Sequence, residues 1–211
     1  PNRDERPMTR RTTTTLRRLT AAGAALALTA SLASCSDNPL SDQYRAGDNK
    51  GFIAADGFRV VEIPTADRGQ PVTFQGVLDT GDAVTSDEYA GDVLVVNFWY
   101  AACAPCRVEA PELEAAHEAF ADEDVSFLGV NIYDGAAAAT AFADTYGVTY
   151  PSALATVDAS VKLAFAERTP LNAVPTTIVL DRQGRVAARV IGQLSSASVL
   201  KTIISETLDE S

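Results

Sequence analysis

Hydrophobic and polar positions along the chain predict strands and helices that alternate. Two nearly continuous apolar runs, residues 93–99 and 125–132, are typical of strands buried on both faces. After each run, apolar residues recur at helical spacing, over residues 104–121 and 136–146. Gly147 ends the second of these segments, as glycine commonly ends a helix. The pattern therefore predicts an α/β protein built around buried strands.

Shorter patterned segments complete the expected order. Four of them have the composition of strands: 58–63, 72–78, 176–180 and 185–191. A hairpin turn from Asp181 to Gly184 joins the last two. Helices are expected at 157–165 and at 195–208, the latter capped by Ser195 or Ser196. The predicted order is β-β-β-α-β-α-α-β-β-α.

The N-terminal part of the chain has a different pattern. An Arg-rich segment leads into the short apolar segment 19–33, which is typical of a secretory signal and too short to span a membrane comfortably. The stretch Leu32-Ala33-Ser34-Cys35 resembles a bacterial lipobox, in which cleavage precedes the cysteine and a lipid is attached to it. We therefore predict a signal peptide of the lipoprotein type over residues 1–34 and lipid attachment at Cys35. Ordinary cleavage nearby and a retained anchor are the alternatives.

Composition divides the remainder into two parts. Residues 35–56 are polar and rich in Asp, Ser, Asn and Gly, which predicts a flexible tether, and residues 57–211 form the predicted folded domain. The chain carries 17 basic and 28 acidic residues, a net charge of −11. Six Arg and two acidic residues lie in 1–34, so residues 35–211 carry a net charge of −15. Nucleic-acid binding needs a basic face, so we expect no nucleic-acid partner.

Two of the three cysteines, Cys103 and Cys106, lie between the first buried run and the helix that follows it. A thiol at a helix start faces unpaired backbone N–H groups and the positive end of the helix dipole, which favour the reactive thiolate. We therefore expect Cys103, which sits at the helix start and can be exposed, to be the attacking thiol and Cys106, one turn later, to resolve the mixed disulfide. A zinc site lacks ligands, since His117 is the only histidine. A purely structural disulfide is the other alternative, although so short a loop is stabilised little by a disulfide.

Further motifs accompany the pair. The sequence N-F-W-Y-A-A-C-A-P-C at 97–106 is followed by Glu109 and Pro111, and V-P-T-T occurs at 174–177. Together these resemble the TlpA/ResA/DsbE-like branch of the thioredoxin-superfamily thiol:disulfide oxidoreductases, here in a lipoprotein form. The resemblance covers roughly residues 58–209. It implies an α/β, thioredoxin-like fold with a central mixed β-sheet flanked by helices, an N-terminal β extension and a central insertion. It implies no cofactor and no metal.

The resemblance also assigns supporting residues. It implies that Pro175 is cis, packs against the disulfide and leaves the backbone of Val174 free to pair with a substrate strand. Trp99 is expected in the core beside the pair. An acid at the position of Glu109 often lies near the disulfide in this family and is able to exchange a proton with Cys106. A solvated helix acid without a role is the alternative for Glu109. Asn97 stands where thioredoxin has a buried Asp, which raises the importance of Glu109.

Three functions follow from these residues. The first is a membrane-tethered extracytoplasmic thiol:disulfide oxidoreductase that exchanges electrons with exported protein thiols and disulfides, with cytochrome c maturation as one such role. A membrane thiol-electron donor is a further expected partner. The second is a thioredoxin-fold, peroxiredoxin-like peroxidase, although Tyr100-Ala101-Ala102 lacks the Ser or Thr that such a site uses before its cysteine. The third, copper delivery, lacks a histidine in the last third of the chain.

Overall fold

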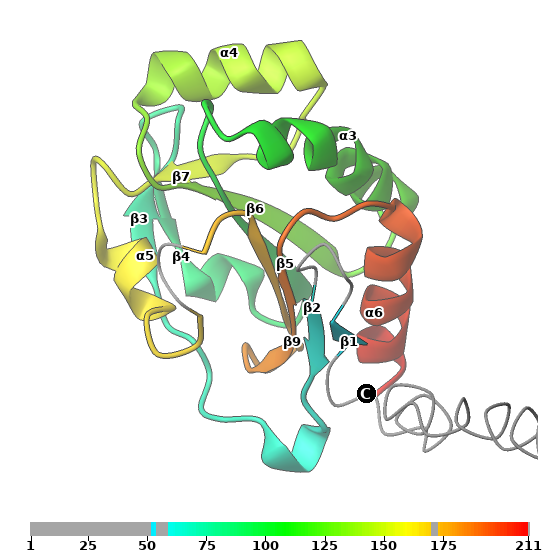
Figure 1. Ribbon diagram of the computed structural model, residues 1–211. Helices are drawn as coiled ribbons and strands as arrows, with labels where there is room; N and C mark the ends of the chain where they lie inside the picture. The colour runs from blue at the N-terminus through cyan, green and yellow to red at the C-terminus, as the bar shows by residue number, and fades with distance from the viewer. Residues whose placement is uncertain (1–51, 54–58, 170–172, 211) are drawn as a thin grey trace, which may run out of the picture. The chain divides into compact units, whose positions relative to one another are not determined.

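Strand β5 (Val93–Trp99) lies inside a mixed sheet and leads directly to the cysteine pair. The computed structural model describes residues 52–53, 59–169 and 173–210, and within them the sheet has seven strands in the order β1-β2-β9-β8-β5-β6-β7. β5 pairs parallel with β6 (Val125–Asn131) and antiparallel with β8 (Thr176–Leu180). All seven β5 side chains are buried, as the apolar run predicts. The expected fold class, a mixed sheet flanked by helices, is confirmed (Figure 1).

The other strands are short. In the main sheet they are β1 (Phe52–Ile53), β2 (Arg59–Glu62), β7 (Ser152–Leu154) and β9 (Val186–Ile191). A separate hairpin consists of β3 (Gln75–Val77) and β4 (Ala83–Thr85). Two 3₁₀ turns, η2 (Thr65–Asp67) and η3 (Ser86–Tyr89), adjoin these strands. Of the strands in the second half, β8 and β9 agree closely with the predicted runs, including the hairpin turn between them.

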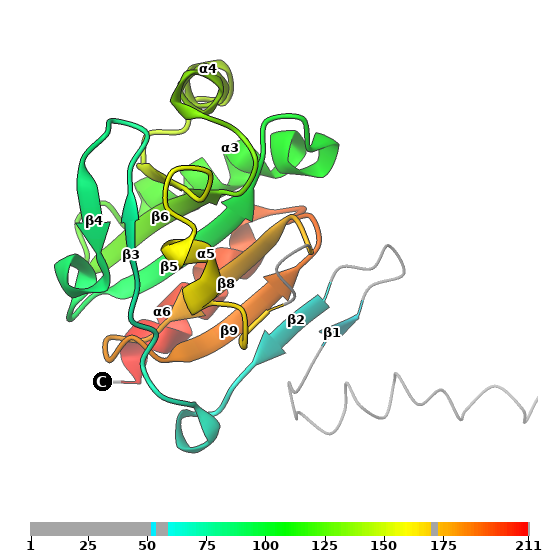
Figure 2. The ribbon, with the colours of Figure 1, turned by 90° about the vertical axis from the view of Figure 1, so that its left-hand side faces the viewer.

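Helices cover both faces of the sheet (Figures 1 and 2). Helices α3 (Ala104–Ala119) and α6 (Ala197–Asp209) pack on one face, where Leu113 and Leu200 share a core with Val95. The opposite face is covered by α5 (Ser160–Ala164) and the β3–β4 hairpin, and there Val161 shares a core with Val96. Helix α4 (Ala136–Tyr146) ends at Gly147 in a left-handed conformation, as predicted. Its Phe142 packs with the cysteine pair.

Several elements differ from the sequence prediction. β4 and β7 were not predicted, because three residues are too few to show a period of two. Val72 and Phe74 were expected in a strand, but their N–H groups donate to the carbonyl of Gly184 and to Ser86 Oγ instead of to a ladder. Helix α5 is shorter than the predicted segment 157–165, because residues 165–168 continue as turns.

The N-terminal predictions fall largely outside the described residues. The signal peptide, Cys35 and most of the tether belong to segments that the structure does not describe, so their boundaries stay predictions. Phe52 and Ile53 lie within the expected tether, yet they pair antiparallel with β2. Strand pairing therefore starts upstream of Gly57, where we expected the domain to begin. In the described part of the chain, the helices are too short or too polar to cross a lipid bilayer.

Candidate active site

Cys103 and Cys106 form a disulfide at the start of α3, with their Cα atoms 5.3 Å apart. Cys103 is the N-cap residue of the helix, and its Sγ accepts a hydrogen bond of 3.1 Å from the backbone N–H of Cys106. The Cys103 N–H donates to the carbonyl of Tyr100, which closes the turn after β5. Pro105 suits this first helical turn, where a backbone N–H has no partner within the helix. The sulfur of Cys103 therefore lies where the helix dipole favours a thiolate.

Both cysteines are buried, with exposed fractions of 3% for Cys103 and 2% for Cys106. In the disulfide form Cys103 is therefore no more accessible than Cys106, although its place at the helix start led us to expect that it can be exposed. The reason is packing, because Tyr100, Ala101 and Val174 pack against the apolar cluster that holds the two cysteines. A reacting sulfur must consequently enter between these side chains.

The V-P-T segment lies beside the disulfide, although it is distant in sequence. The Val174–Pro175 peptide bond is cis, as the resemblance implies. Val174 packs against the cysteine cluster, and Pro175 is buried. The Pro175 carbonyl accepts a hydrogen bond of 3.0 Å from the N–H of Gly192, beyond the end of β9. This hydrogen bond fixes the open end of the β8–β9 hairpin beside the disulfide.

Glu109 is buried one turn beyond Cys106, with 1% of its surface exposed. The structure therefore contradicts the alternative of a solvated acid. Glu109 Oε1 accepts from Asn97 Nδ2 at 2.9 Å, and its Oε2 accepts from the backbone N–H of Leu194 at 2.8 Å. Burial raises the pKa of Glu109 to about 7, against the opposing effect of these two hydrogen bonds. The carboxyl group is consequently able to exchange a proton near neutral pH.

A narrow crevice lies behind Cys106, with room for at most one water molecule. Its polar lining includes Asn97, Tyr150 and Ser152. Asn97 therefore links the crevice to Glu109, to which it donates a hydrogen bond. Burial, followed by the charges of Glu109 and Glu114, raises the pKa of Tyr150 well above its usual range, so its hydroxyl stays protonated.

Trp99 forms a wall of this crevice and is only 5% exposed, in agreement with the expected core position. Its indole N–H donates to Ser152 Oγ at 3.3 Å, and its ring stacks on Phe142 with the centroids 4.2 Å apart. The contact requires a glycine at position 129, because a Cβ there would lie 2.8 Å from Trp99 Nε1. Trp99 therefore fixes the back of the site instead of lying on the surface.

Sequence reasoning missed two groups at this site. Asn97 was interpreted only as the loss of a titratable residue, yet it is the side chain that holds Glu109. A single amide within an otherwise apolar strand is the signal that pointed to a buried polar partner. The N–H of Leu194 has no sequence signal, since any residue supplies a backbone donor.

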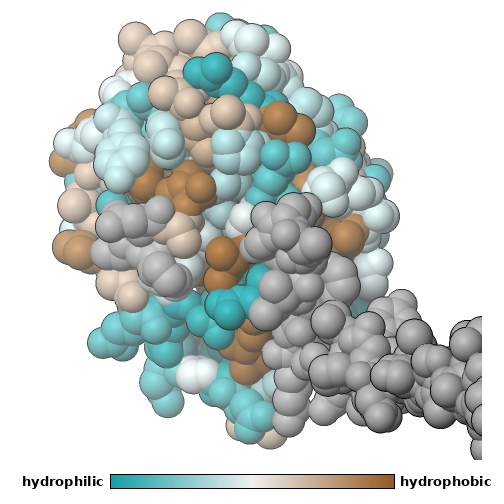
Figure 3. Space-filling view, viewed as in Figure 1, coloured by the Kyte–Doolittle hydropathy of each residue, from teal (hydrophilic) through white to brown (hydrophobic). Residues whose placement is uncertain are grey.

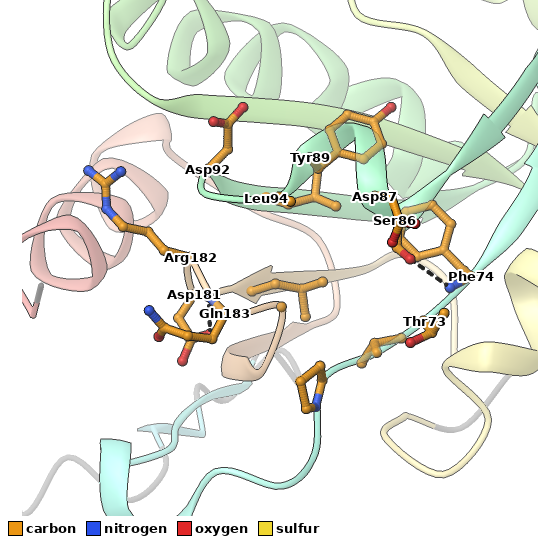
Figure 4. Close-up of a pocket in the computed structure, with 15 residues that line it drawn as sticks. Thr73, Phe74, Ser86, Asp87, Tyr89, Asp92, Leu94, Asp181, Arg182 and Gln183 are labelled. Carbon is orange, nitrogen blue, oxygen red and sulfur yellow. Dashed lines mark hydrogen bonds between the residues drawn. The ribbon is translucent and has the colours of Figure 1, made fainter.

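A larger hollow occurs at the opposite end of β5 from the cysteines (Figure 4). Phe74, Leu94 and Leu180 line it, and Figure 4 shows the guanidinium of Arg182 directed away from Phe74. That guanidinium binds Asp124 and the carbonyl of Gly91. The described residues contain no cluster of three His, Cys, Asp or Glu side chains suited to a metal.

Exposed apolar side chains are dispersed over the described surface. On the face drawn in Figure 3, hydrophobic residues form separate patches divided by hydrophilic ones. The large hydrophobic residues with high exposure are Val108, Tyr133, Val157 and Leu163. Isolated residues of this kind are normal on soluble domains and do not by themselves mark a second site.

Comparisons with known proteins agree with this geometry. The family described as Redoxin matches residues 64–204. The chain is 27% identical to the thiol-disulfide oxidoreductase ResA of Bacillus subtilis over 119 residues, which are 56% of this chain and 64% of ResA. It is 29% identical to the thiol:disulfide interchange protein HelX of Rhodobacter capsulatus over 161 residues, 72% of this chain and 87% of HelX. The match to ResA thus spans slightly less than two thirds of that protein.

Among solved structures, a secreted thiol-disulfide isomerase from Corynebacterium glutamicum superposes with a TM-score of 0.64 at 27% identity. The superposition covers 75% of this chain and 99% of that protein. The resemblance stated from the motifs is therefore confirmed, with its lipoprotein form still a prediction. The chain has the thioredoxin-like fold and belongs to the Redoxin family.

Proposed function

We propose that this protein is an extracytoplasmic thiol:disulfide oxidoreductase that exchanges electrons with cysteines of exported proteins. The observation that carries the proposal is the Cys103–Cys106 disulfide at the start of α3, packed against Val174. A structural disulfide would need neither the helix dipole nor a buried carboxyl group behind it. The names of the relatives, thiol-disulfide oxidoreductase and thiol:disulfide interchange protein, support the same reaction.

The reaction starts from the disulfide seen in the structure. A substrate thiolate attacks Cys103 Sγ, the Cys103–Cys106 bond breaks, and Cys106 leaves as a thiolate that takes up a proton. A second substrate thiolate then attacks the substrate sulfur of the mixed disulfide and releases the Cys103 thiolate. Two electrons pass from the substrate to the pair, and a substrate disulfide forms. The reverse sequence reduces a substrate disulfide, with Cys103 as the attacking group.

Glu109 is the proposed proton partner of Cys106. Both residues are buried on α3, three positions apart, and a pKa of about 7 lets the Glu109 carboxyl give or take a proton at neutral pH. Asn97 lines the crevice behind Cys106 and donates to Glu109. A water molecule in that crevice would connect the thiol to the carboxyl group through Asn97.

The substrate is proposed to bind at the Val174–Pro175 edge. Val174 is partly exposed and packs against the cysteine cluster, so its backbone lies where an extended segment would place a cysteine near Cys103. Proline has no N–H, so Pro175 leaves this edge without a competing donor. Trp99 supports the pair from behind through its contacts with Ser152 and Phe142.

The location and partners rest on the N-terminal sequence. The predicted signal peptide and lipid at Cys35 would tether the protein to the outer side of the cell membrane, where a membrane thiol-electron donor could reach it. The naming of one structural neighbour as secreted supports an extracytoplasmic location. Cytochrome c maturation is the finer proposal for its role. Mass spectrometry of the membrane fraction tests the anchor, since an unmodified Cys35 in a soluble protein would overturn it.

Trapping experiments test the proposed reaction. Cys106→Ser should accumulate mixed disulfides with protein substrates, because Cys103 can attack but nothing resolves the product. Cys103→Ser should trap none and should lose activity in insulin reduction. The reverse trapping pattern would contradict the assigned roles. Rapid hydrogen peroxide consumption without insulin reduction would instead establish the peroxidase alternative.

A further inference from the structure

The backbone N–H and carbonyl of Ala101, two residues before Cys103, are bound by side chains of opposite charge. Its N–H donates to Asp134 Oδ2 at 2.6 Å. Its carbonyl accepts from Arg107 Nε at 2.8 Å. The loop that carries Cys103 is therefore fixed by a carboxylate on one side and a guanidinium on the other.

Asp134 is held in place by the end of β6. Asn131 is fully buried, and its Nδ2 donates to Asp134 Oδ2 at 3.0 Å. The Oδ1 of Asn131 accepts from the backbone N–H of Asp134 at 2.7 Å. The hydroxyl of Thr156 donates to the Asp134 carbonyl at 2.9 Å. These bonds orient the carboxylate toward Ala101 before any substrate arrives.

Arg107 belongs to α3, the helix that begins directly after Cys103. Its backbone N–H donates to the carbonyl of Cys103 at 3.2 Å, and its side chain reaches back to Ala101. Arg107 and Asp134 come from different elements, α3 and the turn after β6, and they bind the two adjacent peptide groups on either side of the Ala101 Cα. Reduction of the disulfide places a negative charge near both.

We propose that Asp134 and Arg107 are positioning residues that hold the loop before Cys103 and set the reduction potential of the pair in opposite directions. This inference rests on the proposed thiol:disulfide function. A nearby carboxylate disfavours the Cys103 thiolate and thus the reduced form, which makes the pair a stronger reductant. The guanidinium favours the thiolate and makes the pair a stronger oxidant.

The expected effect follows from distance and screening. Backbone geometry places the Asp134 charge within about 10 Å of the Cys103 backbone. At an effective dielectric constant near 20 and a Debye length of about 10 Å, one charge at that separation changes an equilibrium about threefold. Threefold corresponds to about 14 mV for a two-electron couple, at 29.6 mV per tenfold change.

The test measures the potential of the Cys103–Cys106 couple by equilibration with glutathione buffers. Asp134→Asn keeps an oxygen that accepts from Ala101 and removes the charge, so the potential should rise by about 14 mV. Arg107→Gln should lower it by a similar amount. Both shifts should shrink at high salt, because these groups are partly exposed to solvent. Potentials unchanged from wild type, or shifts in the same direction, would overturn the proposal.

Positioning is tested separately from charge. Asp134→Ala removes the acceptor as well, so insulin reduction should slow about tenfold, whereas Asp134→Asn should stay within about threefold of wild type. Equal rates for the two variants would refute the positioning role. Asp122→Asn, an exposed acid beyond the far end of α3, controls for net charge and should leave the potential unchanged. If the wild-type protein failed to reduce insulin, that result would count against the proposed function and not against this inference. Equilibration with glutathione measures the reduction potential of the Cys103–Cys106 couple directly, without the insulin assay.

Discussion

Glu109 and Asp181 are both buried carboxyl groups, with exposed fractions of 1% and 4%, but their surroundings differ. Glu109 accepts hydrogen bonds from an amide and a backbone N–H, and no ion pair reaches it from the described residues. Asp181 forms ion pairs with Arg68 at 3.0 Å and Arg185 at 2.8 Å. Burial raises the pKa of Glu109 to about 7. Burial also acts to raise that of Asp181, yet the N–H of Arg185 and the two arginines lower it overall.

The difference teaches that partner charge, and not burial alone, decides which form of a buried carboxyl group the fold stabilises. The ionised Asp181 lies in the turn between β8 and β9, and Arg68 extends the cluster to Glu210 after α6. That cluster connects three parts of the chain and is structural. Glu109, whose carboxyl group has no ion-pair partner among the described residues, lies at the cysteine end of the sheet. A proton must move there during the proposed reaction.

The largest expected effect is on stability, at the Asp181 cluster. Asp181→Asn leaves Arg68, whose side chain is 3% exposed, with Glu210 as its remaining anionic partner. Removing one partner of a buried pair should lower the free energy of unfolding at pH 7 by about 3 kcal/mol. Urea denaturation measures this loss. Because the pKa of Asp181 is lowered by folding, its contribution is present above its unfolded pKa of 3.8 and is lost as pH falls below that value. A loss that stays constant down to acid pH would contradict the assignment of an ionised Asp181.

Glu109 should show the opposite dependence on pH. Its folded pKa of about 7 exceeds the unfolded value of 4.5, so wild type loses stability as pH rises between these values. The full loss is on the order of 3 kcal/mol. Glu109→Gln has no proton to lose and should become more stable than wild type toward pH 8. Unfolding curves at several pH values test this, and parallel pH dependences for the two proteins would refute the raised pKa.

A smaller effect is expected on the reaction itself. Glu109→Gln keeps an acceptor for Asn97 but cannot take a proton from Cys106, so disulfide closure should slow about tenfold. In wild type the rate should rise with pH through about 7, and the variant should lack this rise. Stopped-flow oxidation of the reduced pair measures both properties. Superimposable pH profiles would show that Glu109 does not take the proton and that water or the backbone does.

The smallest effect is expected at an ion pair of the same kind that is exposed to solvent. Arg182 and Asp124 lie 3.0 Å apart, with exposed side-chain fractions of 29% and 71%. Asp124→Asn should change the free energy of unfolding by less than about 1 kcal/mol, because solvent and salt screen exposed pairs. A loss as large as that of Asp181→Asn would show that burial does not separate the two pairs. Both variants should be measured side by side in urea.

The sequence by itself determined the elements whose signals are local. The central strand 93–99, the helix after the cysteines and the Asp181–Gly184 turn follow from periodicity, composition and turn chemistry within a few residues. The cysteine spacing predicted a disulfide across one helical turn, which the structure contains. These features depend on neighbours along the chain, so they need no knowledge of the fold.

Only the tertiary structure decided the state of the polar groups. Glu109 was equally consistent with a solvated and a buried acid until the N–H of Leu194, 85 positions away, and Asn97 were seen to hold it. Asp181 was predicted as a turn residue, but its partner Arg68 lies 113 positions away. Asp134 reaches Ala101 across 33 positions. Burial and charge pairing are set by which segments meet in space, and a pKa responds to those neighbours, whatever their distance along the chain.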